Sequence, residues 1–359
     1  MKCYKVSTSF VFLFSNYQTL SISNTSLVFA QNFFNVSQLE VQDLAVSGSN
    51  RKNFRLVLPN ENHYILTENE FVAENRTFFY LSRMWNHQGI QVPKLLAVNS
   101  SETCYLQEDL GNIDLLNVLQ KEGYTESVFE IYAKSIMHLA QLQIQLKNHI
   151  DYDQCYDFHV FDHKVVQNDM FYFKNFFLDR LDLPYQKAAL IEEITTLATC
   201  IQNLPADYFL YRDFQARNIM LKDHEPYFID FQGGMKGFLG YDLVSLLYQA
   251  KAQLPQEWKT RLTQIYFDIF FEQEKVPRSV LEQGYKYALI VRFYQLLGAY
   301  GLRGLVERKS HFLESIQLHL QHIHLLTDGG YLEEFPYLKQ LNNLLTSTEV
   351  MEKVKQFKP

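Results

Sequence analysis

The fold is decided by the stretch Tyr211-Arg212-Asp213-Phe214-Gln215-Ala216-Arg217-Asn218, followed further on by Phe228-Ile229-Asp230-Phe231-Gln232-Gly233. An acid, an amide five positions later and a second acid after a short apolar run are typical of a phosphoryl-transfer site. In such a site one carboxylate accepts the proton of the attacking hydroxyl, while the amide oxygen and the other carboxylate hold magnesium beside the phosphates. The pattern therefore predicts Asp213 as the catalytic base and Asn218 and Asp230 as metal ligands.

The spacing between these residues has a mechanical reason. Residues 219–221 and 227–229 are apolar, and the turn 222–226 contains a proline, so a hairpin of two short strands is predicted. That hairpin would return Asp230 to the cleft that holds Asp213. A buried loop whose polar groups only satisfy the backbone is disfavoured, because acids and an amide without such a role are costly in apolar surroundings.

With Gly240-Tyr241-Asp242-Leu243 beyond them, these motifs resemble the catalytic and metal loops of the aminoglycoside-phosphotransferase and choline-kinase group. These are small-molecule kinases with a protein-kinase-like fold. The sequences Arg-Asp-Phe-Gln-Ala-Arg-Asn and Asp-Phe-Gln-Gly-Gly are similar to those of the bacterial N-acetylmuramate/N-acetylglucosamine kinases, which phosphorylate cell-wall amino sugars at the anomeric hydroxyl.

The resemblance implies an α+β fold with two lobes, and ATP and Mg²⁺ as cofactors. A small β-rich N-lobe that binds the nucleotide, including the hinge, is expected in 31–111. A larger, mainly helical lobe for catalysis and acceptor binding is expected in 112–359. Residues 1–30 precede the resemblance. Their apolar run is short for a signal peptide, so an N-terminal extension is favoured, with an upstream start codon and an added edge strand left open.

Composition excludes several classes of function. A chain of 359 residues with 47% hydrophobic content can bury the core of two lobes, and its net charge of −7 disfavours nucleic-acid binding. The four cysteines lack metal-type spacing and are predicted to be reduced thiols. No transmembrane span is apparent, and an enzyme that uses ATP is expected in the cytoplasm. The oligomeric state stays open.

The N-lobe is predicted from short alternating runs. A helix is expected over 31–42, strands over 44–48, 53–58 and 63–67, and a helix over 70–85, with two further strands over 92–98 and 104–107. The loop between the first two strands would cover the phosphates through Gly48, Ser49 and Asn50. An ordinary hairpin turn is the alternative.

The resemblance also implies a lysine on the third strand, paired with a glutamate on the following helix. Glu74 is the candidate glutamate, but the strand offers Leu66 and Thr67 and no lysine. Arg51 or Arg55 is then expected to supply positive charge to the phosphates.

Further roles follow from the same resemblance. The carbonyl of Glu108 and the amide of Leu110 are expected to pair with adenine at the hinge. Arg212 would brace the catalytic loop, and Asp242 would cap a helix and accept hydrogen bonds from that loop. The matching region around 168–173 approaches the acceptor, with Asp169 the residue of most interest.

The helical lobe is predicted to begin near 112, with a capping box at 127–130, a long helix over 283–300 and a final helix pair from 327. Four histidines near the C-terminus lack a completing acid or cysteine and are not predicted to bind metal. A group of basic residues near the expected acceptor pocket favours a neutral or anionic acceptor such as a sugar; these are Arg292, Arg303, Arg308 and Lys309.

Two alternatives stay open. Tyr211 stands where many kinases carry histidine, and Gln232 replaces a glycine, so a nucleotide-binding pseudokinase is one. A kinase of another small acceptor, such as an aminoglycoside or choline, is the other.

Overall fold

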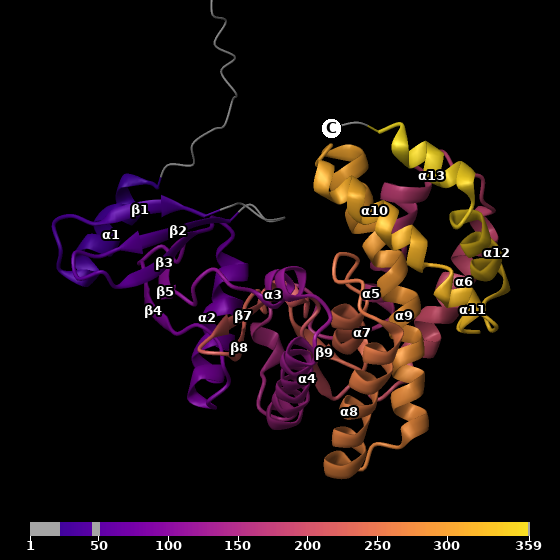
Figure 1. The fold of residues 1–359 in the computed structure, drawn as a ribbon, viewed down its shortest axis with the longest axis horizontal. Coiled ribbons are helices and arrows are strands. Elements are labelled where there is room, and N and C mark those ends of the chain that lie inside the picture. Colours follow the sequence, from indigo (N-terminus) through magenta and orange to yellow (C-terminus); the bar gives the residue numbers. More distant parts are fainter. Residues whose placement is uncertain (1–21, 45–50, 358–359) are drawn as a thin grey trace, which may run out of the picture.

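The computed structural model describes residues 22–44 and 51–357 and has two lobes (Figure 1). The small lobe is built on a sheet of five antiparallel strands in the order β1-β2-β3-β5-β4. These strands are β1 (Glu40–Asp43), β2 (Lys52–Val57), β3 (His63–Glu68), β4 (Leu95–Val98) and β5 (Cys104–Glu108). The remainder is mainly helical, so the predicted α+β fold with two lobes is confirmed.

Two helices flank the sheet of the small lobe. Helix α1 (Asn24–Phe34) packs Ala30 against one face, where alternate residues such as Phe54 and Leu56 of β2 are fully buried. Helix α2 (Val72–His87) lies between the sheet and the helical lobe (Figure 1). It buries Trp85 in the main core of the protein. The sheet is thus covered by helices on both sides, which leaves its inner end to border the cleft.

The predicted helix over 31–42 is wrong in its bounds. The helix begins earlier and ends at Phe34, because Asn35 adopts a left-handed conformation with φ 54° and donates its N–H to carbonyls of the last turn. Asparagine is one of the few residues that tolerate this cap. The chain is already a strand at Glu40, and of the strand predicted over 44–48 all but Leu44 lies outside the described residues.

The chain crosses to the helical lobe after β5. Helix α3 (Leu115–Glu122) and the hairpin of β7 (Ile219–Lys222) and β8 (Glu225–Phe228) lie at the junction of the lobes (Figure 1). The hairpin is the one predicted from the sequence. Helix α4 (Glu126–Leu146) follows, and its N-cap is Thr125, whose hydroxyl accepts from Val128 N. The predicted capping box therefore began two residues late.

The remaining elements build the helical lobe. They are α5 (His163–Phe173), α6 (Lys187–Gln202), β6 (Tyr208–Leu210), β9 (Met235–Gly237), α7 (Tyr241–Leu247), α8 (Gln256–Glu274), α9 (Arg278–Tyr300), α10 (Ser310–His322), α11 (Leu325–Asp328), α12 (Pro336–Leu345) and α13 (Thr348–Lys355). Short 3-10 helices lie at Tyr152–Gln154 and Ala216–Asn218, and π-helical segments at Lys174–Leu178 and Gly301–Val306 continue α5 and α9. Among the described residues, no helix is long and apolar enough to span a membrane.

Helices α5 and α9 approach each other closely at glycines. A Cβ added to Gly298 would lie 2.7 Å from the backbone nitrogen of Phe173, and one added to Gly301 would lie 2.3 Å from the carbonyl oxygen of Phe176. Side chains at these two positions would force the helices apart. The glycines therefore fix α9 against α5, and both helices carry residues of the cleft described below.

His319 is the buried histidine of α10. Its Nε2 lies 2.9 Å from the carbonyl oxygen of Phe293, and the ring is fully buried. Burial lowers the pKa of His319 to about 4, although the hydrogen bond to Phe293 opposes this shift. The folded protein therefore binds fewer protons at this site than the unfolded chain between about pH 6.5 and 4.

We expect this difference to destabilise the protein in mild acid. The contribution of His319 is fully present above pH 6.5 and falls as the pH drops, by roughly 2 kcal/mol at pH 5, while the raised pKa of Asp242 acts in the opposite direction. Urea unfolding at several pH values measures the difference in stability between variant and wild type. As the pH drops from 6.5 to 5, this difference should shift by roughly 2 kcal/mol in favour of His319→Gln and stay constant for His63→Gln, which alters an exposed histidine. Equal slopes in the His319 variant and the wild type would contradict the assignment.

Candidate active site

The catalytic loop is anchored from beneath by Asp242. Its carboxylate accepts hydrogen bonds from the backbone nitrogens of Tyr211 at 2.7 Å and Arg212 at 3.0 Å. Gly240, with φ 105°, is the N-cap of α7, so Asp242 lies in the first turn and does not cap the helix as predicted. Burial raises the pKa of Asp242 to about 7. The loop that begins at Tyr211 is thereby fixed to the start of α7.

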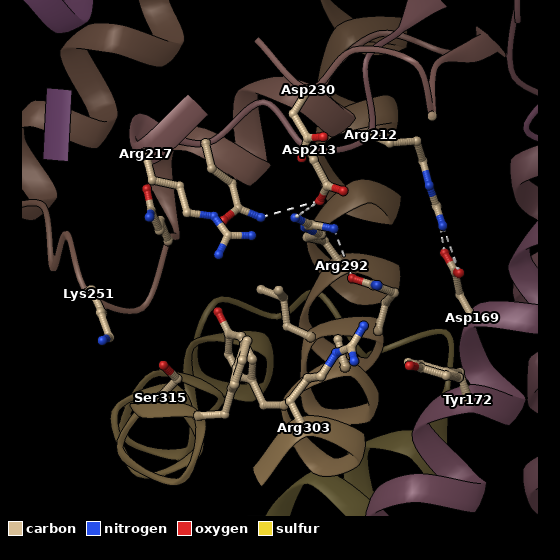
Figure 2. Close-up of a pocket in the computed structure, with 18 of the residues that line it drawn as sticks. Asp169, Tyr172, Arg212, Asp213, Arg217, Asp230, Lys251, Arg292, Arg303 and Ser315 are labelled. Carbon is tan, nitrogen blue, oxygen red and sulfur yellow. Dashed lines mark hydrogen bonds and ion pairs between the residues drawn. The ribbon is translucent and has the colours of Figure 1, made fainter. Parts of the chain in front are cut away.

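Arg212 ties the catalytic loop to α5. Its guanidinium makes two hydrogen bonds to the carboxylate of Asp169, at 2.8 and 3.0 Å, and Asp169 is 2% exposed (Figure 2). The backbone of Arg212 is left-handed, with φ 77°. A paired, two-pronged geometry of this kind is rigid. The side chain therefore braces the loop, and Asp169 serves as its buried partner.

Asp213 borders a cavity of about 610 Å³ that opens toward α5, α9 and α10. Its Oδ1 accepts hydrogen bonds from Arg292 at 3.2 Å and from Gln215 at 3.4 Å. Desolvation raises the pKa of Asp213, but the neighbouring charges of Arg292, Arg217 and Arg212 outweigh it, and the pKa lies below its ordinary value. The carboxylate is therefore ionised at neutral pH, as a proton acceptor must be.

Asn218 and Asp230 turn oxygens toward the cleft. The amide nitrogen of Asn218 donates to the carbonyl oxygen of Asp213 at 2.9 Å, which leaves its Oδ1 for another partner. Asp230 is held in a left-handed conformation with φ 67°. Its Oδ1 accepts hydrogen bonds from Nε2 of Gln232 at 2.8 Å and from Nη1 of Arg51 at 3.4 Å.

The side-chain oxygens of Asn218 and Asp230 are donors of the kind that Mg²⁺ prefers. Mg²⁺ prefers oxygen ligands, and it usually takes one or two carboxylates from the protein and the rest from phosphates and water. One carboxylate and one amide oxygen are a donor set of this kind, which phosphates and water would complete. Among the described residues there is no cluster of three or more histidine, cysteine or acidic side chains suited to a metal. A backbone held in a sparsely populated conformation at Asp230 is also common at functional sites.

Arg51 stands where the missing lysine is expected to act. Its guanidinium pairs with Glu74 of α2, at 2.6 and 3.1 Å, and reaches Asp230. Glu74 also accepts from Asn69 at 2.8 Å. A cation is therefore held between the α2 glutamate and the second acid of the motif. Gly48, Ser49 and Asn50, the expected phosphate loop, lie outside the described residues.

Arg55 lies away from Asp230, at the hinge. It pairs with the carboxylate of Asp109, and its Nη2 donates to the carbonyl oxygen of Gly111 at 3.2 Å. Of the two predicted arginines, Arg51 lies nearer the candidate metal ligand Asp230, and the role of either one at the phosphates stays a prediction. Arg55 instead joins β2 to the hinge. It lines a second cavity of about 260 Å³, whose wall also includes the hinge residues Glu108 and Leu110.

The two cavities meet at three residues. Arg51, Asp230 and Gln232 line both of them, while Asn218 lines only the hinge-side cavity and Asp213 only the larger one. Figure 2 shows Asp213 and Asp230 close together at one end of the larger cavity. The candidate base and the candidate metal ligands thus lie where the two cavities meet, and their roles stay predictions.

The walls of the larger cavity carry cations. Arg217, Lys251 and Arg303 lie around it (Figure 2). Arg303 pairs with Glu307 at 2.6 Å, whereas Arg217 and Lys251 have no ion pair with any described residue. Two other basic residues that the sequence placed near the acceptor pocket do not line this cavity. Arg308 lies over the ring of Phe357, and Lys309 pairs with Glu307 outside the cavity lining.

A family model described as the phosphotransferase enzyme family (APH) matches residues 40–277, which include the small lobe's sheet and the whole catalytic loop. The chain belongs to this phosphotransferase family.

The curated relatives share about a quarter of the residues in the part of the chain that they match. The chain is similar to an N-acetylmuramate/N-acetylglucosamine kinase of Neisseria meningitidis serogroup B, with 26% identity over 184 residues. That match covers 50% of this chain and 52% of the relative, so the chain spans about half the length of the curated relatives it matches.

Solved structures support the fold over most of the chain. An aminoglycoside phosphotransferase, APH(2'')-IIa in complex with gentamicin, has a TM-score of 0.58 at 15% identity and covers 84% of this chain and 97% of its own. A choline kinase from Cryptosporidium parvum has a TM-score of 0.58 at 16% identity, and the match covers 90% of this chain and 100% of the choline kinase. At these identities the likeness establishes the architecture alone.

Among the residues of the cleft that sequence reasoning missed are two cations. Arg217 lies inside the catalytic motif, four residues after Asp213, and its position on the loop could have signalled a place in the cavity. Lys251 follows α7 in a turn, and no local pattern indicates it. Both side chains reach the cavity only because the loop and the turn meet there.

Proposed function

We propose that this protein transfers the terminal phosphate of ATP to a hydroxyl of a small molecule, with Mg²⁺ as cofactor. The observation that supports this most is the meeting of the two cavities at Asp230, with Asp213 on one side and Asn218 on the other. A nucleotide in the hinge-side cavity would place its phosphates at that border. An acceptor in the larger cavity would present its hydroxyl to Asp213.

The candidate site residues would then have the following roles. The backbone of Glu108 and Leu110 would pair with adenine, and Arg51 would hold the phosphates. Asn218 and Asp230 would hold Mg²⁺, which supplies charge neutralisation at the phosphates when bound. Asp213 would orient the acceptor hydroxyl and take its proton. A positioned base of this kind contributes about 10²–10⁴-fold in rate.

The acceptor we propose is a cell-wall amino sugar, N-acetylmuramate or N-acetylglucosamine, phosphorylated at the anomeric hydroxyl. The name of the curated relative supports this class. Charge supports it too, because the cations Arg217, Lys251 and Arg303 would repel a cationic aminoglycoside or choline and favour a carboxylate. An enzyme that uses ATP and a recycled sugar is expected in the cytoplasm.

A panel of acceptors tests the proposal. The purified protein is incubated with Mg²⁺ and ATP and either amino sugar, an aminoglycoside or choline, and the product is read by phosphorus and proton NMR. The expected product is the α-1-phosphate of an amino sugar. Phosphate on another hydroxyl, or turnover of the aminoglycoside or choline alone, would contradict the proposed acceptor while leaving the phosphotransferase activity in place.

The cationic wall should discriminate between the two sugars. In Arg217→Ala and Lys251→Ala, we expect the KM for N-acetylmuramate to rise by about tenfold, since a charge-assisted contact to its carboxylate is lost. The KM for the neutral N-acetylglucosamine should change little. The ratio of the two KM values is the readout, and equal changes for both sugars would show that these residues do not recognise the carboxylate.

The ATP site should depend on Arg51. Replacing it with alanine removes the cation between Glu74 and Asp230, so we expect the KM for ATP to rise by about tenfold or more. Initial rates at varied ATP measure this. Arg76→Ala is the matched control, because Arg76 is an exposed arginine of α2 paired with Glu102. An unchanged KM in the Arg51 variant would place the phosphate contact elsewhere.

A nucleotide-binding pseudokinase is the second candidate. The third strand lacks the lysine, and Tyr211 and Gln232 depart from the usual kinase residues. However, Tyr211 donates its hydroxyl to the carbonyl of Ile229, and Gln232 donates to Asp230, so both support the metal loop. Magnesium-dependent ATP consumption by the wild type separates the two, since a scaffold would bind nucleotide without consuming it.

A further inference from the structure

The carboxylate of Asp213 is held asymmetrically. Arg292 and Gln215 both donate to its Oδ1, at 3.2 and 3.4 Å. No described residue donates a hydrogen bond to its Oδ2. The two oxygens of the base are therefore in different states before any substrate binds, with one engaged by the protein and the other left at the cavity.

Arg292 is held rigidly at this position. It lies within α9 and is 2% exposed, whereas the side chain of Asp213 is 49% exposed. Its Nη1 donates to Gln295 at 2.8 Å and approaches the Tyr241 hydroxyl at 3.5 Å. The guanidinium is thus fixed by its own helix and by α7, and it presents Nη2 to Asp213.

The same geometry argues against a direct contact between Arg292 and the acceptor. The sequence placed Arg292 near the acceptor pocket, and it does line the larger cavity, but a guanidinium that is 2% exposed and already engaged by Asp213 and Gln295 offers little to a ligand. Arg217, Lys251 and Arg303 line the same cavity and are more exposed than Arg292. The action of Arg292 on the reaction therefore runs through Asp213.

We propose that Arg292 is a positioning residue which, with Gln215, holds Oδ1 of Asp213 and so selects Oδ2 as the atom that meets the acceptor hydroxyl. This rests on the proposed phosphotransferase function. The hydroxyl proton passes to Oδ2 as the acceptor oxygen bonds to the terminal phosphorus of ATP. The bond from that phosphorus to the bridging oxygen breaks, and ADP leaves with its electrons. Without Arg292, rotation of the carboxylate would let either oxygen face the hydroxyl.

Kinetics of three variants test this. In Arg292→Gln we expect kcat to fall by about 10²-fold, the size of loss that a misplaced reacting group produces, with both KM values within about threefold of wild type. Arg292→Lys keeps a charged donor and should recover part of the rate. Gln215→Leu should show a smaller loss. Arg261→Gln, which alters an exposed arginine paired with Glu126, should match the wild type.

Two kinetic results would overturn the proposal. One is a kcat of Arg292→Gln within threefold of wild type. The other is an unchanged kcat with a raised KM for the acceptor, which would mean that Arg292 binds the acceptor directly. The comparison uses whichever acceptor the wild type phosphorylates, so a wrong choice of sugar does not affect it.

Crystal structures give a second readout that needs no turnover and no acceptor. Asp213 should show one orientation in the wild type, with Oδ1 toward Arg292. In Arg292→Gln and Gln215→Leu, the carboxylate should rotate or occupy two orientations. An unchanged single orientation in both variants would overturn the proposal even if the protein proves to be a scaffold.

Discussion

Replacing Asp213 with asparagine is expected to lower kcat by about 10²–10⁴-fold while nucleotide affinity stays within a few-fold of wild type. The amide keeps the shape of the side chain and can still accept from Arg292, but it cannot take the acceptor proton. A coupled assay for ADP measures kcat, and calorimetry measures nucleotide binding. The variant should stay folded, because the side chain is about half exposed.

The control for this variant is Asp268→Asn, which changes an exposed acid of α8 paired with Arg278 and should have full activity. A kcat of Asp213→Asn within fivefold of the wild type would mean that another group accepts the proton. A loss of nucleotide binding together with activity would instead place Asp213 in the nucleotide site.

The second large loss of activity is expected when Asp230 is replaced with asparagine. We expect kcat/KM to fall by about 10²–10³-fold at ordinary magnesium concentrations, because one negative charge that would bind the cation is removed. Asparagine tolerates the left-handed backbone at this position, so the loop should be preserved. Raising the magnesium concentration should restore part of the rate, since the weakened site can be driven by mass action.

Magnesium titrations at saturating ATP measure this prediction. The concentration needed for half-maximal rate should rise in Asp230→Asn and stay near the wild-type value in Asp213→Asn. If both variants require the same magnesium concentration as the wild type, Asp230 does not bind the ion.

The catalytic motif was predictable from sequence because its geometry is local. Asp213 and Asn218 lie on one loop, and the β7–β8 hairpin returns Asp230 beside them through a short, strongly patterned segment. The helical lobe was predictable in outline for a similar reason, because long apolar periodicities define its helices. The end of α1 was not, because a left-handed Asn35 leaves no periodic trace.

The two N-lobe arginines show where sequence reasoning stops. Arg51 and Arg55 are four residues apart, so on an extended chain they share a face and lie about 13 Å from each other. The pattern therefore makes both candidates for the same cleft. Glu74 of α2 and Asp109 of the hinge decide between them, and these partners come together only through the tertiary fold.

Arg292 lines the larger cavity, as expected, but the burial of its side chain was not predictable from the sequence. A helical arginine near an expected pocket suggests a contact with substrate, and depth below the surface cannot be read from periodicity. In the structure the side chain of Arg292 is 2% exposed, pairs with Asp213 and contributes to the lining of the larger cavity. Its pairing with the half-exposed Asp213, and not its charge alone, supports the positioning role that we propose.

The most direct test of a shared metal and phosphate site is a crystal structure with Mg²⁺ and a non-hydrolysable ATP analogue. The predicted result is Mg²⁺ bound by the side-chain oxygens of Asn218 and Asp230, adenine at the hinge, and the terminal phosphate facing Asp213. A nucleotide bound outside the hinge-side cavity, or a metal that touches neither Asn218 nor Asp230, would contradict it.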